Sequence, residues 1–119
     1  MSLVQVALGG AIGASLRYGV NLTLSRGGFP WHTLVVNILG SALMGALMVW
    51  LAHRGHQALA PLLMTGCLGG FTTFSAFSMD TMALMQRGQT VQAVLYVGAS
   101  VLLSLAAFAL AAQLTRSLT

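Results

Sequence analysis

Residues 69–78 read GGFTTFSAFS and place two glycines, four hydroxyl groups and three phenylalanine rings inside a strongly hydrophobic segment. Glycines are poor helix formers, and the two threonines that follow them are typical of a helix start. We therefore predict two half-helices, with an unwound piece near 69–73 and a second half that begins at Phe74. Unwound backbone at membrane depth often holds ions. The carbonyl oxygens of residues such as Gly69 and Thr72 are hard ligands that would suit Na⁺.

Phenylalanines recur at three-residue steps through the same segment, at Phe71, Phe74 and Phe77. Residues three apart share one side of a helix, so the last two lie along one side of the second half-helix, with Ser75 beside them. Such a stripe is also typical of ordinary packing. The edge of an aromatic ring is positive, however, and ring edges next to hydroxyl groups and a cation would form a weakly electropositive route for a small anion.

Two other hydrophobic segments carry polar residues that would face this route. Asn37 must find partners in an apolar environment, and its amide offers two N–H donors either to a neighbouring helix or to a passing anion. Tyr96, Ser100 and Ser104 follow one another at four-residue steps and so share one helix face. A single serine is uninformative because its hydroxyl can bond its own helix. Three polar groups in register predict a ladder of hydroxyl and amide groups through the apolar interior.

Arg17 lies in the first hydrophobic segment, four and eight residues after Gly13 and Gly9. The three residues share one helix face, so a strip of small residues leads to a cation. An arginine near the middle of a membrane costs roughly 2.5–3.5 kcal/mol, which predicts that Arg17 faces protein or water. It either extends to the lipid headgroups or forms a positive vestibule that attracts anions.

The elements that position these residues must be membrane helices. The chain has 119 residues, of which 57% are hydrophobic and 5% charged, and its mean hydropathy is +0.88. A helix needs about 20 residues to cross the hydrocarbon, so the chain is long enough for four spans and almost no soluble domain. The short breaks between the spans combine Gly, Arg and polar residues. The predicted spans cover residues 3–24, 32–52, 58–86 and 91–114.

Basic residues are divided almost evenly between the two sides of the predicted membrane. The net charge is +4, but the five arginines do not form a patch that would suit nucleic acid. Arg26 and Arg87 fall on one side, and Arg54 and Arg116 on the other. Orientation in the membrane follows an imbalance of basic residues, and this chain has almost none. The sequence therefore predicts that one chain can insert in both orientations.

The run GCLGGFTTFSAFSMD, with TLVVNILGS and GGAIGASLRYG before it, resembles the Fluc/CrcB family of fluoride channels. The similarity covers nearly the whole chain in the right order. It implies an all-α membrane protein of four spans with the third broken, assembled in the lipid of the cell inner membrane as an antiparallel, dual-topology homodimer. It also implies two fluoride pores, a central Na⁺ ion, and passive export that lowers cytoplasmic fluoride.

The resemblance also implies roles for individual residues. Gly69 and Thr72 would hold Na⁺ through their backbone carbonyls, and Arg17 would stand at the vestibule. Two positions depart from the family pattern, because Ala76 and Phe108 replace residues that often carry a hydroxyl. These departures affect the completeness of the polar track. The implied fluoride pathway consists of Asn37, Phe74, Phe77, Ser75, Tyr96, Ser100 and Ser104.

Three other function classes compete with a channel. A proton-coupled multidrug exporter of similar size would use a carboxylate, and Asp80 is the only acidic residue in the chain. Such exporters place a glutamate in the first span, and this sequence has no glutamate. A non-conducting assembly subunit would use its Gly, Ser and Asn residues for packing alone. An enzyme is not expected, because the sequence offers no paired carboxylates and no nucleophile with a base.

Overall fold

The computed structural model describes residues 2–24, 29–55 and 57–118, and every regular element in these ranges is helical. Four segments are long and apolar enough to cross a membrane. The predictions of an all-helical fold and of a multi-pass membrane protein are therefore confirmed. Arg26, which entered the charge comparison, lies outside the described residues. The four segments are Leu3–Leu24, Trp31–His53, Pro61–Gln86 and Thr90–Leu118.

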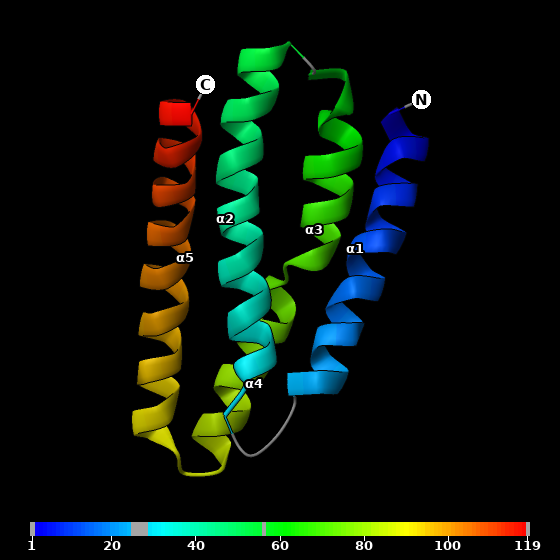
Figure 1. Cartoon of the computed structure of the whole chain (residues 1–119). Helices are drawn as coiled ribbons and strands as arrows, with labels where there is room; N and C mark the ends of the chain where they lie inside the picture. Colours follow the sequence, from blue (N-terminus) through cyan, green and yellow to red (C-terminus); the bar gives the residue numbers. More distant parts are fainter. Residues whose placement is uncertain (1, 25–28, 56, 119) are drawn as a thin grey trace.

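The long helices alternate in direction, so that both ends of the chain lie at the same end of the molecule (Figure 1). The molecule is 49 Å long, more than the roughly 30 Å thickness of the hydrocarbon layer. The helical elements in chain order are α1 (Ser2–Leu24), α2 (Trp31–Arg54), η1 (Gln57–Leu59), η2 (Pro61–Leu68), α3 (Gly69–Phe71), α4 (Phe74–Gln86) and α5 (Thr90–Leu118).

The ends of the helices follow from local chemistry. Pro30 precedes the first residue of α2. Gly55 ends α2 in the left-handed conformation, with φ of 72°, and its amide bonds the carbonyl of Leu51. Gly88 adopts a φ of 77° in the turn before α5. Helix α5 continues to Leu118, beyond the predicted end at residue 114, because the added residues contain no glycine or proline.

The third span changes its backbone conformation twice. Its first part, η2, is π-helical, and the short α3 follows it directly. Thr72 and Thr73 are extended, with φ/ψ of −82°/159° and −154°/127°. Helix α4 begins at Phe74, with Thr73 as its N-cap. Gly69 and Gly70, which we expected in the unwound piece, are both helical.

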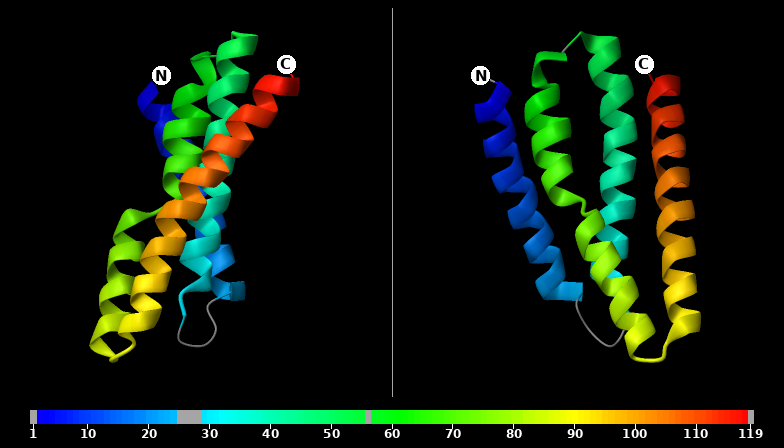
Figure 2. Two further views of the ribbon diagram at one scale, coloured as in Figure 1. Left: turned by 90° about the vertical axis from the view of Figure 1, so that its left-hand side faces the viewer. Right: turned by 180° about the vertical axis from the view of Figure 1, so that it is seen from behind.

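The two parts of the third span pack against different neighbours. The part from η2 to α3 lies beside α1, whereas α4 lies beside α5 and also contacts α2. Figure 2 shows that the chain shifts sideways between these two parts. The extended threonines therefore move the polypeptide from one neighbouring helix to the other.

Glycines bring α1 and the third span into backbone contact. A Cβ atom on Gly9 would lie 2.7 Å from the amide nitrogen of Cys67, and one on Gly13 would lie 2.7 Å from that of Phe71. A Cβ on Gly70 would meet the carbonyl oxygen of Gly10 at 2.8 Å. No real side chain tolerates such distances. The predicted small-residue face of α1 is thus confirmed as a close helix contact.

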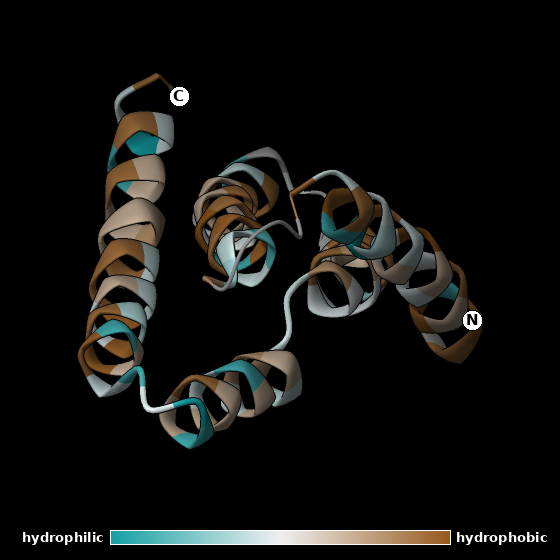
Figure 3. Cartoon of the chain, turned by 90° about the horizontal axis from the view of Figure 1, so that it is seen from below, coloured by the Kyte–Doolittle hydropathy of each residue, from teal (hydrophilic) through white to brown (hydrophobic). Residues whose placement is uncertain are grey.

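A small core joins α2, α4 and α5. Leu34, Leu84, Ala93 and Tyr96 are buried together, and Phe77 packs against them. Many large hydrophobic side chains point outward instead, as expected where lipid replaces water as the solvent. Figure 3 shows hydrophobic residues along most of each helix, and hydrophilic ones at the turn between α4 and α5 among other places.

Candidate functional site

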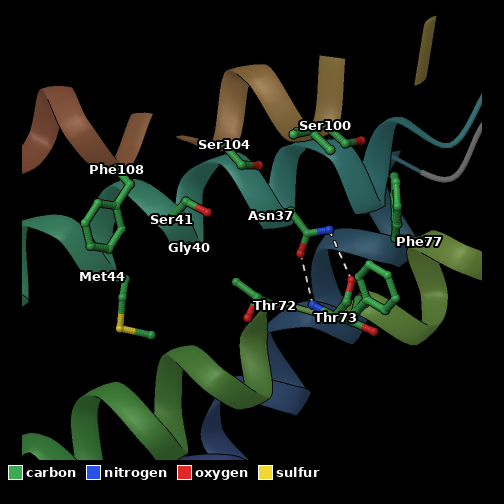
Figure 4. A pocket seen from close by; sticks show the side chains of 12 residues that line it. Asn37, Gly40, Ser41, Met44, Thr72, Thr73, Phe77, Ser100, Ser104 and Phe108 are labelled. Carbon is green, nitrogen blue, oxygen red and sulfur yellow. Dashed lines mark hydrogen bonds between the residues drawn. The ribbon is translucent and has the colours of Figure 1, made fainter. Parts of the chain in front are cut away.

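A largely open cavity of about 330 Å³ lies between α2, α5 and the extended threonines of the third span. Polar groups and aromatic rings share its wall, as Figure 4 shows. Met44 and Phe108 lie toward one end of the view, and Thr73 and Phe77 toward the other. The wall brings together five of the seven residues predicted for the fluoride pathway, which are Asn37, Phe74, Phe77, Ser100 and Ser104.

Asn37 holds the backbone of Thr73 by two hydrogen bonds. Its Oδ1 accepts a bond of 2.9 Å from the Thr73 amide, and its Nδ2 donates one of 3.1 Å to the Thr73 carbonyl. In a continuous α-helix this amide would bond to the carbonyl of Gly69. The side chain of Asn37 therefore replaces a helix bond. One of its two N–H donors is engaged there, so Asn37 connects two helices and also lines the cavity.

Thr73 caps the helix that follows it. Its Oγ1 accepts a hydrogen bond of 3.1 Å from the amide of Ala76, as expected of a threonine at this position. The same oxygen lies 3.2 Å from Oγ of Ser75. Ser75 is exposed and does not line the cavity, which separates it from the five predicted pathway residues that do.

Ser100 and Ser104 present hydroxyl groups that have no hydrogen-bond partner among the described residues, although their Oγ atoms are buried. Ser100 is only 6% exposed, and both serines line the cavity from α5. Other hydroxyls in this protein bond a carbonyl of their own helix, such as that of Ser15 to Ala11 at 2.7 Å. Because a buried hydroxyl without a partner is costly, these two are suited to a polar species within the cavity.

The two predicted phenylalanines form a tilted pair on α4. The ring centroids of Phe74 and Phe77 lie 5.6 Å apart, with 43° between the ring planes. The ring of Phe77 also packs against that of Tyr96, and their centroids lie 5.2 Å apart. Phe74 is 77% exposed and so contributes almost nothing to the packing of this chain. Its exposure leaves the ring available for contacts that lie outside the single chain.

Tyr96 faces a carboxylate and does not line the cavity. Its hydroxyl donates to Oδ2 of Asp80 over 3.2 Å, and Thr33 Oγ1 donates to the same oxygen over 2.7 Å. Asp80 therefore joins α2, α4 and α5. From the sequence, Asp80 was considered only as the proton carrier of a competing exporter, and this connection was not predicted. The signal was available, because a single carboxylate within a hydrophobic span must find hydrogen-bond donors.

Arg17 contacts the backbone of the third span. Its Nε donates a hydrogen bond of 3.1 Å to the carbonyl oxygen of Gly70, and the side chain is half-buried. Arg17 also lines a second cavity, of about 80 Å³, together with Asn21, His32 and Ala76 among others. The prediction that Arg17 faces protein or water is thus confirmed.

The extended segment offers backbone oxygens as possible cation ligands. The carbonyl of Gly69 lacks its usual helical donor, since the amide of Thr73 bonds to Asn37 instead. Thr72 is extended, so its carbonyl is not part of a regular helix. The described ranges hold no cluster of three or more His, Cys, Asp and Glu side chains that could bind a metal. Backbone carbonyl oxygens are ligands of the kind that hard cations take in proteins.

Some residues of the cavity wall were not selected from the sequence. Gly40 lies on α2 directly against Thr72, whose methyl group would have to shift to admit a Cβ at this position. Thr73 was predicted only as a helix cap, and Phe108 only as a departure from the family pattern. A glycine within a hydrophobic helix indicates close contact, but it does not identify the partner.

Comparison with known proteins identifies the family. The family described as CrcB-like protein, Camphor Resistance (CrcB), matches residues 4–112. A protein of Paracoccus denitrificans (strain Pd 1222) named fluoride-specific ion channel FluC is 59% identical over 108 residues, covering 89% of this chain and 87% of that protein. A protein of the same name from Ruegeria sp. (strain TM1040) is 55% identical over 120 residues, covering 98% and 95%. Another, from Rhizobium etli (strain CIAT 652), is 50% identical over 107 residues, covering 86% of each chain.

The resemblance that the sequence motifs predicted is therefore confirmed. The relatives are named as ion channels and not as enzymes, in agreement with the sequence analysis. The family match covers most of the described helices, and it includes the whole wall of the larger cavity. This chain belongs to the CrcB family.

Proposed function

We propose that this protein is a fluoride-specific ion channel that lets fluoride leave the cytoplasm passively. One observation carries the proposal: a single cavity within the membrane-spanning part is lined by Asn37, by Phe74 and Phe77, and by two serines whose hydroxyls have no partner among the described residues. The names of the relatives favour the same function. The multidrug exporter and the non-conducting subunit have no comparable support.

Selectivity for fluoride would come from the types of group along the wall. Fluoride holds its water strongly, so a pathway must offer donors in place of that water. The hydroxyls of Ser100 and Ser104 can donate to an anion because no described residue is hydrogen-bonded to them. The second N–H of Asn37, for which no acceptor appears among the described residues, and the positive edges of the Phe74 and Phe77 rings would add to this potential. Larger halides would be excluded mainly by the width of the path.

The functional assembly, in this proposal, is an antiparallel homodimer of chains in both orientations. The even division of arginines allows one sequence to insert both ways. Phe74 lines the cavity and is nevertheless 77% exposed, so the outer face of its ring meets either lipid or a further protein surface. A second copy would supply this surface and complete the wall of each pathway. We place the dimer in the cell inner membrane.

A sodium ion bound to the extended part of the third span belongs to the same proposal. Its ligands would be the carbonyls of Gly69 and Thr72, and the first of these lacks its helical donor. Bound there, the cation would supply a positive field near the anion pathway. The break between α3 and α4 would then be a functional feature of the span.

Fluoride efflux from liposomes tests the proposed function. Vesicles that contain the purified protein are loaded with potassium fluoride or potassium chloride, and efflux is started with a potassium ionophore. We expect rapid fluoride loss and no chloride loss above that of empty vesicles. Equal rates for the two anions would remove the claim of selectivity, and no fluoride loss would remove the claim of a channel.

A further inference from the structure

Two carbonyl groups at the end of α3 lose their helical partners where the chain becomes extended. In a continuous helix Gly69 would bond to the amide of Thr73, and Gly70 to the amide of Phe74. The amide of Thr73 instead bonds to Asn37, and the carbonyl of Gly70 accepts from Arg17 over 3.1 Å. The guanidinium group therefore donates to the carbonyl of Gly70. The carbonyl of Gly69 has no comparable side-chain donor in the described part of the chain.

The packing of α1 brings Arg17 to this carbonyl. Gly13, one helical turn before Arg17, lies against the backbone of Cys67 and Phe71. The backbone of Gly10 approaches Gly70 in the same way. Because these contacts are between backbones, they leave little freedom in the distance between α1 and α3. The donor at Nε therefore reaches Gly70 from a helix whose position is already determined.

We propose that Arg17 is a positioning residue for the cation site, a role that rests on the proposed function. By holding the Gly70 peptide, Arg17 directs that carbonyl toward α1 and leaves Gly69 and Thr72 as the oxygens open to a cation. A positive side chain also suits the negative end of a helix. On this view the N–H group at Nε matters more to the cation site than the charge does.

Two substitutions separate the donor from the charge. In Arg17→Gln, the Nε2 amide nitrogen occupies the same place along the side chain as Nε of arginine, so the donor stays and the charge is lost. In Arg17→Lys the charge stays, but a methylene group takes the place of the donor. Arg17→Met removes both. Arg116 is exposed in the last turn of α5, so Arg116→Gln and Arg116→Lys are matched controls.

The measurement is the apparent melting temperature of the purified protein in detergent, as sodium chloride replaces choline chloride at constant ionic strength. A bound cation raises the melting temperature in a concentration-dependent way. We expect the sodium concentration that gives half of the stabilisation to be no higher for Arg17→Gln than for the unsubstituted protein. Loss of a nearby positive charge cannot weaken cation binding. For Arg17→Lys this concentration should be roughly tenfold higher, or sodium should not raise the melting temperature at all. The Arg116 variants should match the unsubstituted protein.

The opposite pattern, with sodium stabilisation lost in Arg17→Gln and kept in Arg17→Lys, would overturn the proposal. So would equal sodium dependence in all variants, or none in the unsubstituted protein. If Arg17→Met does not fold, the glutamine and lysine variants still decide the question. Fluoride efflux is measured separately on the same preparations. A protein that shows the expected sodium pattern but conducts no fluoride would refute fluoride transport and leave the cation site, and the role of Arg17 in it, standing.

Discussion

The two parts of the third span differ in what holds them. The part from Pro61 to Phe71 packs on α1 through glycines, so that backbone meets backbone. The part from Phe74 to Gln86 packs on α5 and α2 through side chains, among them Phe77 and Asp80. The first arrangement leaves no room for variation in the packing distance. The second places side chains where they can interact with an ion, and Phe74 and Phe77 line the larger cavity.

The first part of the span therefore serves the assembly of the fold, and the second part serves the ion pathway. Substitutions before the extended threonines should act on assembly of the fold, because they change the distance between α1 and the third span. Substitutions after the threonines should act on the ion pathway, with smaller effects on stability. Substitutions of Arg17 or Asn37 should affect both stability and the ion pathway, because each side chain bonds the backbone at the junction between the two parts.

The largest effect is expected from adding a methyl group to the glycine face. Gly13→Ala would place Cβ against the backbone of Cys67 and Phe71, which cannot move aside as a side chain can. We expect destabilisation of about 3 kcal/mol or more, seen as loss of monodisperse protein. Gly10→Ala is the matched control, because no atom of another described element lies within 4 Å of its added Cβ. Equal yields for the two variants would contradict the distinction between the two parts.

The next largest effect is on transport. Phe74→Ile removes an aromatic ring from the cavity wall while changing little of the packing, since the ring is 77% exposed. We expect fluoride efflux to fall roughly tenfold or more, with an unchanged melting temperature. Phe77→Ile should reduce efflux in a similar way and also lower stability, because Phe77 packs against Tyr96. Unchanged efflux in both variants would assign the phenylalanines to packing alone.

A loss of stability smaller than that of Gly13→Ala is expected at the carboxylate that joins three helices. Asp80→Asn keeps the shape of the side chain but removes the charge that accepts bonds from Thr33 and Tyr96. We expect a loss of about 1.5–3 kcal/mol of stability, measured by unfolding in mixed detergent micelles. Tyr96→Phe removes one of the two bonds and should cost less. If Asp80→Asn is as stable as the unsubstituted protein, the carboxylate does not hold α4 in place.

The smallest effect on stability is expected at the cavity serines. Ser100→Ala should lower stability by no more than about 0.5 kcal/mol, because its hydroxyl has no partner among the described residues to lose. Fluoride efflux should fall about fivefold if the hydroxyl donates to the anion. Ser15→Ala, on exposed α1 surface, is the control for both measurements. A destabilised Ser100→Ala protein would show that the hydroxyl serves the fold.

Much of the candidate site could be predicted from residue types and spacing. Asn37, Ser100 and Ser104 were selected as polar groups on apolar helices, and they line one cavity with the two phenylalanines. Tyr96 and Ser75 were selected by the same reasoning, but the first bonds Asp80 and the second lies exposed beside Thr73. Helical spacing places residues on a face. It does not say whether the face meets a cavity, a carboxylate or the outside.

By itself, the sequence determined the helices, the number of spans and the glycine face of α1, because hydrophobic length and periodicity act within one segment. Only the tertiary structure decided which groups meet across segments. Arg17 bonds Gly70 across 53 positions of the chain, Asn37 bonds Thr73 across 36, and Thr33 bonds Asp80 across 47. A backbone group that leaves its helix must find a donor or acceptor wherever the packing brings one. No local pattern in the sequence specifies that partner.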